Sequence, residues 1–347
     1  MKSDYRIPAA PSRARRWSLA MGCTLLLGMI GANPYQRAQA GSAEMDETSP
    51  TAAIEVPAIP ETVTAGPANI ATSPTDRPAN LLWADEFDVL DLSTSTHIGA
   101  WRANDFWQNI NRGYRDFAGS SWNLNPNEHP AHSPFSVENG VLSIKVRRTP
   151  AELRRSIAAS MAAQGQDGGV PEWSGGVLVS NRDVRTMHYG YLEIRARLPN
   201  PGAGMFPALW LFAADQGNNP LNKGQAEIDI LEVFGQRSGS PWHSNLHFKD
   251  NSQVSVRPNQ NVITATDTTA WHTYGLDWQP SYLRFYRDGA LVWEVAGTDA
   301  QWFNTRMQVR LNYAMDGRFY GFVPSDSTTP DEMRMDIDYV RVHASRP

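Results

Sequence analysis

The stretch that decides the fold is Ala226-Glu-Ile-Asp-Ile-Leu-Glu-Val-Phe-Gly235, which sets three acidic residues in an apolar, β-branched run. Such residues favour a strand, whose side chains point alternately to its two faces. Glu227 and Asp229 therefore share a face, whereas strict alternation would bury Glu232, and an unpaired buried carboxylate is costly. One extra residue, a β-bulge at about Ile230-Leu231, would return Glu232 to the acidic face. The sequence thus predicts a bulged strand that presents three carboxyl groups to one side of a sheet.

Three neighbouring carboxyl groups repel one another, which disfavours stability but suits acid–base chemistry. Such groups drive each other's pKa values apart, so that one stays ionised while another holds a proton. Glycoside hydrolysis with retention uses a nucleophile and an acid that later becomes a base, with carboxyls roughly 5–5.5 Å apart. The alternative is an acidic surface strand without chemistry, and the stretch alone does not separate the two interpretations.

The composition narrows the functional class. The net charge of the 347 residues is −5, so the basic surface typical of nucleic-acid binding is absent from the sequence. Twelve tryptophans and eleven tyrosines are many for this length. Exposed aromatic rings suit sugar faces, although core packing is the alternative for most of them. A single cysteine excludes an internal disulfide.

The N-terminus has the organisation of a signal peptide over residues 1–40. A basic region precedes an apolar run and a small-x-small cleavage site: Arg13 to Arg16, residues 19–30 and Ala38-Gln-Ala40. The apolar run is shorter than the about 20 residues that span a membrane. We expect a secreted or periplasmic protein without a membrane span after cleavage, with a lipoprotein anchor at Cys23 as the alternative.

Residues 41–77 are rich in Ala, Thr, Pro, Ser and Glu, which predicts a disordered linker before a folded domain at 78–347. The domain reads as short alternating strands, and Asn139-Gly140 and Asp288-Gly289 are hairpin turn signals. This pattern predicts an all-β jelly-roll sandwich of two antiparallel sheets.

One helix is predicted after residue 149. Thr149, Pro150 and Glu152 form the pattern of a capping box. The apolar residues that follow share one helical face: Leu153, Ile157 and Met161. The helix could flank a substrate cleft or pack against the outside of the sandwich.

Five further groups of residues lie in order between about 80 and 345: Leu82-Trp-Ala-Asp-Glu-Phe-Asp88; Tyr189 to Leu198 with Gly204 to Leu211; Trp271 to Trp278 with Phe285 to Gly289; Leu311 to Met315; and Ile337 to Val342. Their order and spacing resemble glycoside hydrolase family 16, which includes laminarinases, lichenases, agarases and rhizobial exopolysaccharide glycanases. The acidic stretch is similar to the family's bulged Glu-x-Asp-x-x-Glu motif. The resemblance implies a jelly roll with a concave substrate cleft.

The resemblance also implies roles for individual residues. Glu227 would be the nucleophile and Glu232 the acid/base, with Asp229 between them and hydrogen-bonded to the nucleophile. Substrate contacts are expected on strands or loops beside them, with structural packing as the alternative for each: Trp210, His247, Trp107, Trp122 and Trp173.

Two departures and one possible metal site follow from the same resemblance. Val177 stands where laminarinases carry a cleft arginine, and Phe206 replaces their usual tryptophan. Both changes argue against plain β-1,3-glucan specificity. The form of the segment around Val177, Trp173-Ser-Gly-Gly-Val-Leu178, with Leu211-Phe-Ala-Ala-Asp215 downstream, resembles the bacterial exopolysaccharide glycanases. A structural calcium would be held by Glu86, the Gly140 carbonyl and Asp338, whose oxygen ligands suit this ion; solvated acids are the alternative.

The sequence therefore predicts a secreted, retaining endo-β-glycanase that hydrolyses a β-linked polysaccharide, namely β-1,3- or mixed-linkage glucan or a bacterial exopolysaccharide. No organic cofactor and no nucleic-acid partner are expected, and the protein is expected to be a monomer. Two alternatives stay open. One is a non-catalytic carbohydrate-binding protein on the same fold, and the other is a transglycosylase that uses the same residues.

Overall fold

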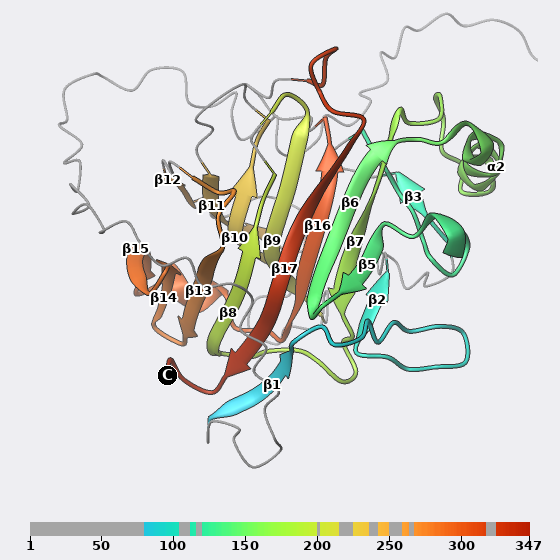
Figure 1. Ribbon diagram of the computed structural model, residues 1–347. Helices are drawn as coiled ribbons and strands as arrows, with labels where there is room; N and C mark the ends of the chain where they lie inside the picture. Colours follow the sequence, from blue (N-terminus) through green and yellow to red (C-terminus); the bar gives the residue numbers. More distant parts are fainter. Residues whose placement is uncertain are drawn as a thin grey trace, which may run out of the picture. The chain divides into compact units, whose positions relative to one another are not determined.

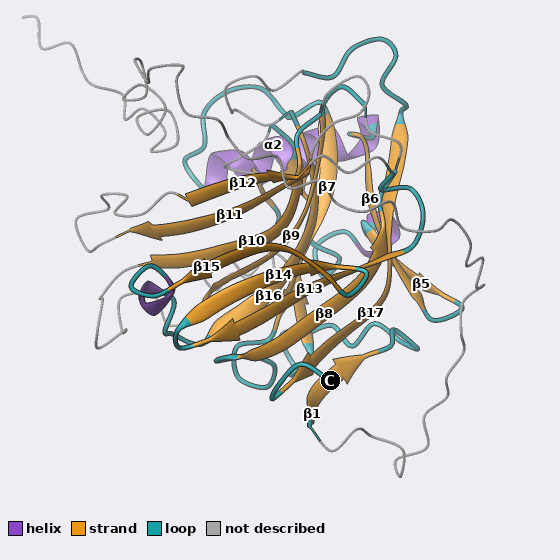
Figure 2. Cartoon of the chain, turned by 90° about the vertical axis from the view of Figure 1, so that its left-hand side faces the viewer, coloured by secondary structure: helices purple, strands orange, loops and turns teal. Residues whose placement is uncertain are grey.

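Two stacked antiparallel sheets form the body of the domain (Figures 1 and 2). The computed structural model describes residues 80–103, 112–115, 120–199, 202–214, 225–235, 242–249, 259–263, 267–316 and 324–347. The predicted signal peptide and linker lie outside these residues. In the described part of the chain, no helix has the length and apolar character needed to cross a bilayer.

The first sheet contains the acidic stretch, and we call it the acidic sheet. Its strands follow the order β12 (Asn259–Ile263), β11 (Trp242–Lys249), β10 (Gln225–Val233), β9 (Met205–Ala213), β16 (Met307–Met315), β7 (Trp173–Ser180) and β2 (Trp101–Ala103). Every neighbouring pair in this order is antiparallel, so the acidic strand β10 lies between β9 and β11.

The second sheet lies against the inner side of the acidic sheet. Its order is β15 (Ala290–Ala296), β14 (Tyr282–Arg287), β13 (His272–Gln279), β8 (Gly190–Arg197), β17 (Glu332–His343), β6 (Val141–Arg148) and β5 (Phe135–Glu138). The C-terminal half of β17 pairs with β1 (Leu81–Asp85), which takes the place of β6 there. These pairs are also antiparallel, and the predicted all-β jelly-roll sandwich is confirmed.

The core fills the space between the two sheets. Ile228 and Leu211 from the acidic sheet and Leu276 and Val340 from the second sheet are fully buried in one cluster. Because strand side chains alternate, the neighbours of Ile228 and Leu211 along the chain must point to the other side of the acidic sheet. That other side carries the three acidic residues, and we call it the acidic face.

The predicted hairpin turns are confirmed by their backbone conformations. Asn139 and Gly140 have φ of 52° and 75° between β5 and β6, and Asp288 and Gly289 have φ of 48° and 77° between β14 and β15. Positive φ at both central residues is the mark of a type I′ turn, whose twist matches that of the strands it joins.

The predicted helix is present, but its start differs from the prediction. The chain enters through a 3-10 turn, Ala151–Leu153, and continues as α2, Arg154–Ala163. Neither segment has a side-chain cap, so the expected capping box is wrong: Pro150 occupies the position before the turn, and the chain starts with 3-10 rather than α-helical geometry.

The apolar face of α2 is as predicted, and it covers a small cluster apart from the main core. Leu153, Ile157 and Met161 are buried there against Trp122 and Leu124. Trp122 belongs to β4 (Trp122–Asn123), which pairs with β3 (Tyr114–Arg115) and runs parallel to the start of β7. Figure 1 shows α2 beside β3, at the β7 end of the acidic sheet.

Candidate active site

The bulge in β10 is the feature that brings the three carboxyl groups to one face. Against β9, Asp229 pairs with Trp210, Leu231 with Leu209 and Glu232 with Ala208, so Ile230 is the extra residue. The register against β11 shifts at the same place. The predicted bulge is therefore confirmed, and Val233 returns to the core, where it is 3% exposed.

The bulge is held by a buried hydroxyl group. The Oγ of Ser244, on β11, donates a hydrogen bond of 2.7 Å to the carbonyl oxygen of Ile230. Ser244 is fully buried. A bulged residue leaves the regular ladder, and its carbonyl would otherwise be short of a partner in a dry environment. Ser244 thus fixes the backbone at the position that turns Glu232 outward.

Strand β11 supplies a polar side chain opposite each acid. His247 pairs with Glu227, Asn245 with Asp229, and His243 with Glu232. Strand β9 supplies apolar or aromatic partners on the other side of the same residues: Phe212, Trp210 and Ala208. Trp210 and His247 therefore adjoin the acidic strand, as the sequence predicted. Each carboxyl group therefore lies between a polar side chain of β11 and an apolar or aromatic side chain of β9.

Burial is the main influence on Glu232. It raises the pKa of this carboxyl well above its ordinary value, and the charges of Asp229 and Glu227 raise it further. The charge of His247 and a hydrogen bond from Asn245 act in the opposite direction. The amide Nδ2 of Asn245 donates to Oε2 of Glu232, which favours the ionised carboxylate. Burial and the two neighbouring charges thus favour the protonated form of Glu232, whereas His247 and Asn245 favour its ionised form.

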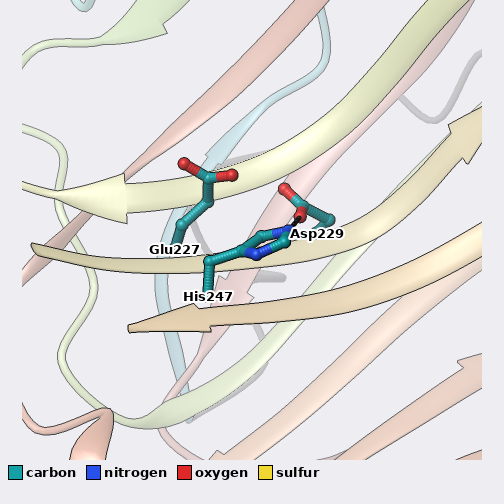
Figure 3. A group of neighbouring side chains, drawn as sticks. All are labelled: Glu227, Asp229 and His247. Atoms are coloured by element: carbon teal, nitrogen blue, oxygen red, sulfur yellow. Dashed lines mark ion pairs between the residues drawn. The ribbon is translucent and has the colours of Figure 1, made fainter. Parts of the chain in front are cut away.

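Asp229 is the most buried of the three acids, with 3% of its surface exposed. Burial, followed by the charge of Glu227, raises its pKa well above the ordinary value. Its Oδ2 lies 3.3 Å from Nε2 of His247 and accepts no hydrogen bond from the described residues. The expected hydrogen bond between Asp229 and Glu227 stays a prediction. Figure 3 shows His247 reaching across from β11 toward Asp229, with Glu227 beside them.

A buried cation that sequence reasoning missed lies beside the aromatic side chains of β9. Arg310, on β16, is 2% exposed, and its guanidinium lies 5.1 Å from the Trp210 ring centroid and 4.7 Å from that of Phe212. Trp210 also donates from Nε1 to Oδ1 of Asn312 over 2.6 Å. Polar residues at alternate positions of an otherwise apolar strand, Gln308, Arg310 and Asn312, were the available signal.

Two other residues at the Glu232 end were also missed. Asn245 could have been found because His243, Asn245 and His247 occupy every second position of one strand and therefore share a face. Phe234, half-buried after the end of β10, lies between Phe206 and His243, with ring centroids at 5.6 Å and 4.5 Å. Its position beside Glu232 gives this end of the acidic face an aromatic side chain.

The predicted tryptophan platforms need correction. Trp122 and Trp173 are fully buried, the first beneath α2 and the second in the main core. A ring with no exposed face cannot stack on a sugar, so neither residue contacts substrate in this arrangement. Trp107 lies outside the described residues.

Two of the three residues predicted to hold calcium, Glu86 and Asp338, are already engaged by arginines. Glu86 accepts two hydrogen bonds from Arg341, at 2.9 Å and 2.8 Å. Asp338 accepts one from Arg195 at 2.5 Å. A divalent cation would have to displace both guanidinium groups, so the side chains as arranged do not fit calcium. Binding of calcium there stays an untested prediction.

Comparisons with known proteins agree with the geometry. The profile of the family described as Glycosyl hydrolases family 16 matches residues 131–341. Endo-1,3-1,4-β-glycanase ExsH of Rhizobium meliloti is 31% identical over 268 residues, covering 76% of this chain and 51% of the relative. Glucan endo-1,3-β-glucosidase A1 of Niallia circulans is 27% identical, covering 78% of this chain and 39% of the relative. The chain thus spans about half the length, or less, of these curated relatives.

Solved structures show the same architecture. SCLam, a non-specific endo-β-1,3(4)-glucanase, superposes with a TM-score of 0.56 at 28% identity, covering 78% of this chain and 93% of that one. The laminarinase catalytic domain of Thermotoga maritima, at 22% identity and a TM-score of 0.54, shares the fold, covering 77% of this chain and 99% of its own. The match of the family profile to more than half of the sequence, together with the bulged acidic strand, shows that the chain belongs to glycosyl hydrolases family 16.

Proposed function

We propose that this protein is a retaining endo-β-glycanase that cleaves internal bonds of a β-linked glucan or a related bacterial exopolysaccharide. The observation that carries the proposal is the bulged strand β10, which directs Glu227, Asp229 and Glu232 to one face. The names of the relatives, endo-1,3-1,4-β-glycanase and glucan endo-1,3-β-glucosidase, support the substrate class.

In the first proposed step, Glu232 acts as a general acid. Its raised pKa supports a protonated carboxyl group in the free enzyme. Because Asn245 donates to Oε2, the proton to be transferred is assigned to Oε1. Oε1 gives that proton to the glycosidic oxygen as Glu227 attacks the anomeric carbon. The bond between that carbon and the leaving oxygen breaks, and a glycosyl ester of Glu227 forms.

In the second proposed step, water displaces the Glu227 carboxylate from the anomeric carbon. Neutralising Glu227 as an ester removes one negative charge that raised the pKa of Glu232. Glu232, now ionised, takes a proton from water, the oxygen of that water attacks the anomeric carbon, and the ester bond to Glu227 breaks. Two displacements at the same carbon retain its configuration.

Asp229 and His247 are proposed to tune the nucleophile. The raised pKa of Asp229 favours its protonated form, which lowers the repulsion on Glu227 as that carboxylate approaches the sugar. His247, opposite Glu227 and 3.3 Å from Asp229, is placed to contact both acids and a bound sugar. Trp210 and Phe234 are proposed as aromatic contacts for substrate.

Secretion is proposed from residues 1–40 alone, with cleavage before Gly41 and export to the periplasm or the medium. Sequencing the N-terminus of the protein recovered outside the cytoplasm tests it: a terminus at Gly41 supports the proposal, and retention of Met1 contradicts it. A monomeric state is likewise proposed, and size-exclusion chromatography with light scattering tests it.

The catalytic proposal is tested with Glu227→Gln and Glu232→Gln, using Glu138→Gln on β5 as the control. We assay release of reducing ends from laminarin, mixed-linkage glucan, agarose, κ-carrageenan and succinoglycan. Loss of a general acid is expected to lower the rate by roughly 10²–10⁴-fold, while the control keeps its activity. NMR of the first-formed anomer is expected to show retention.

Other outcomes distinguish the alternatives. Binding without any release of reducing ends would indicate a carbohydrate-binding protein, and lengthened products without net release would indicate a transglycosylase. An inverted first product would contradict the role of Glu227 as nucleophile.

A further inference from the structure

Three potential ligand atoms of different residues converge on the acidic face. One carboxylate oxygen each of Glu227 and Asp229 and one imidazole nitrogen of His247 all lie within 4.8 Å of one another. Figure 3 shows them side by side, two from β10 and one from β11. The cross-strand pairing of Glu227 with His247 fixes this arrangement through the backbone rather than through mobile loops.

The closest pair in this group has the spacing of two ligands on one ion. Nε2 of His247 and Oδ2 of Asp229 are 3.3 Å apart. A tetrahedral zinc ion about 2.0–2.2 Å from each ligand would hold them roughly 3.4 Å apart. Glu227 is only half-buried, so a side-chain rotation can bring its carboxylate into the third position.

A second observation concerns the same oxygen of Asp229, which lies 3.3 Å from Nε2 of His247 but has no hydrogen-bond donor among the described residues. Oδ2 of Asp229 is buried, in a residue 3% exposed, and accepts no hydrogen bond from the residues that the structure describes. A buried polar atom without a partner is unfavourable and uncommon. A cation between Asp229 and His247 would satisfy this oxygen directly.

We propose that Glu227, Asp229 and His247 form an inhibitory site for a divalent transition metal of the zinc type. One imidazole and two carboxylates leave a fourth position open, which zinc fills with water or another small ligand. Magnesium and calcium prefer six or more oxygen ligands and fit this group poorly. Bound metal would occupy the carboxylate of Glu227, so that its lone pair could not attack a sugar. The inhibitory effect rests on the proposed function, whereas the binding site does not.

Binding is measured first, because it needs no substrate. Isothermal titration of the full chain with ZnCl₂ is expected to show one site per chain that His247→Ala weakens at least roughly tenfold. Asp229→Asn removes a second ligand with little change of shape and is expected to weaken the site likewise. If His247→Ala does not fold, the zinc affinity of Asp229→Asn tests the site instead. His243→Ala is the matched control on the same face of β11, and its zinc affinity is expected to equal that of the wild type.

Inhibition is measured second, on whichever polysaccharide the wild type cleaves. Zinc is expected to inhibit hydrolysis competitively with substrate, EDTA to restore it, and magnesium at the same concentration to have no effect. Equal zinc affinity in the wild type and both ligand variants would overturn the proposed site. Zinc binding at this site without loss of hydrolysis would overturn its inhibitory role. Absence of hydrolysis on every substrate would count against the proposed function, while the binding result would still decide the site.

Discussion

Replacing Asp229 by asparagine is expected to stabilise the fold at mildly alkaline pH. Asp229 is 3% exposed, and burial and the charge of Glu227 raise its pKa well above the ordinary value. A carboxyl whose folded pKa exceeds its unfolded pKa contributes stability below the unfolded value, near about 3.9. This contribution is lost as the pH rises through the folded pKa. The wild type is therefore expected to lose stability toward alkaline pH.

The size of the effect follows from linkage. Each unit by which folding raises the pKa costs about 1.4 kcal/mol once the pH exceeds the folded pKa. Asparagine has nearly the same shape and carries no charge, so at about pH 8 it removes this cost. For a domain of this size, about 1.4 kcal/mol corresponds to a rise in Tm of roughly 3–6 °C. The difference is expected to vanish near about pH 4, where both side chains are neutral.

Thermal unfolding from about pH 4 to about pH 8, in EDTA to keep the acidic face metal-free, measures this difference. Asp336→Asn is the matched control, because Asp336 is 4% exposed but accepts hydrogen bonds from Ser143 and Arg197. Losing these contacts is expected to lower Tm. Two results would contradict the inference that ionised Asp229 destabilises the folded protein. One is a lower Tm of Asp229→Asn at alkaline pH, as expected for Asp336→Asn. The other is a Tm raised by the same amount at every pH.

Three further predictions concern the acidic face and the ion pair of Glu86 with Arg341. Asn245→Ala removes a hydrogen bond that favours ionised Glu232; the alkaline limb of the kcat–pH profile should move to higher pH, and a shift to lower pH would contradict this. Ser244→Ala leaves the bulged Ile230 carbonyl without its buried donor and should cost about 1–3 kcal/mol in urea unfolding; an unchanged midpoint would show that the hydroxyl does not hold the bulge. EDTA should leave Tm unchanged because arginine already pairs with Glu86, whereas a calcium-dependent rise in Tm would restore the calcium prediction.

The parts of the fold that the sequence predicted are those governed by local physics. The bulge followed from the cost of burying Glu232, and the hairpins followed from Asn-Gly and Asp-Gly pairs that tolerate positive φ. Trp210 and His247 were placed through the strand order that the family resemblance implied.

The parts that were missed depend on contacts between residues far apart in the sequence. Trp122 is buried because the inserted helix α2 covers it, and composition cannot show which tryptophan a helix will cover. Arg310 joins Trp210 and Phe212 only through the pairing of β16 with β9. The strand that lacks the expected arginine, with Val177 in its place, lies directly beside β16. The acidic face therefore keeps a guanidinium one strand away from the position that the resemblance indicated.

The bulge serves the stability of β10 as well as its chemistry. In a regular strand Ile230 and Leu231 would face opposite sides, and one of them would lie among the acids. In the bulged strand Ile230 is 1% exposed and Leu231 is fully buried, so two consecutive apolar side chains enter the core. Burying such a side chain contributes about 1.5–3 kcal/mol, comparable to holding one carboxyl a unit or two above its ordinary pKa. The same extra residue that turns Glu232 toward Glu227 thus offsets part of the cost of gathering three acids on one face.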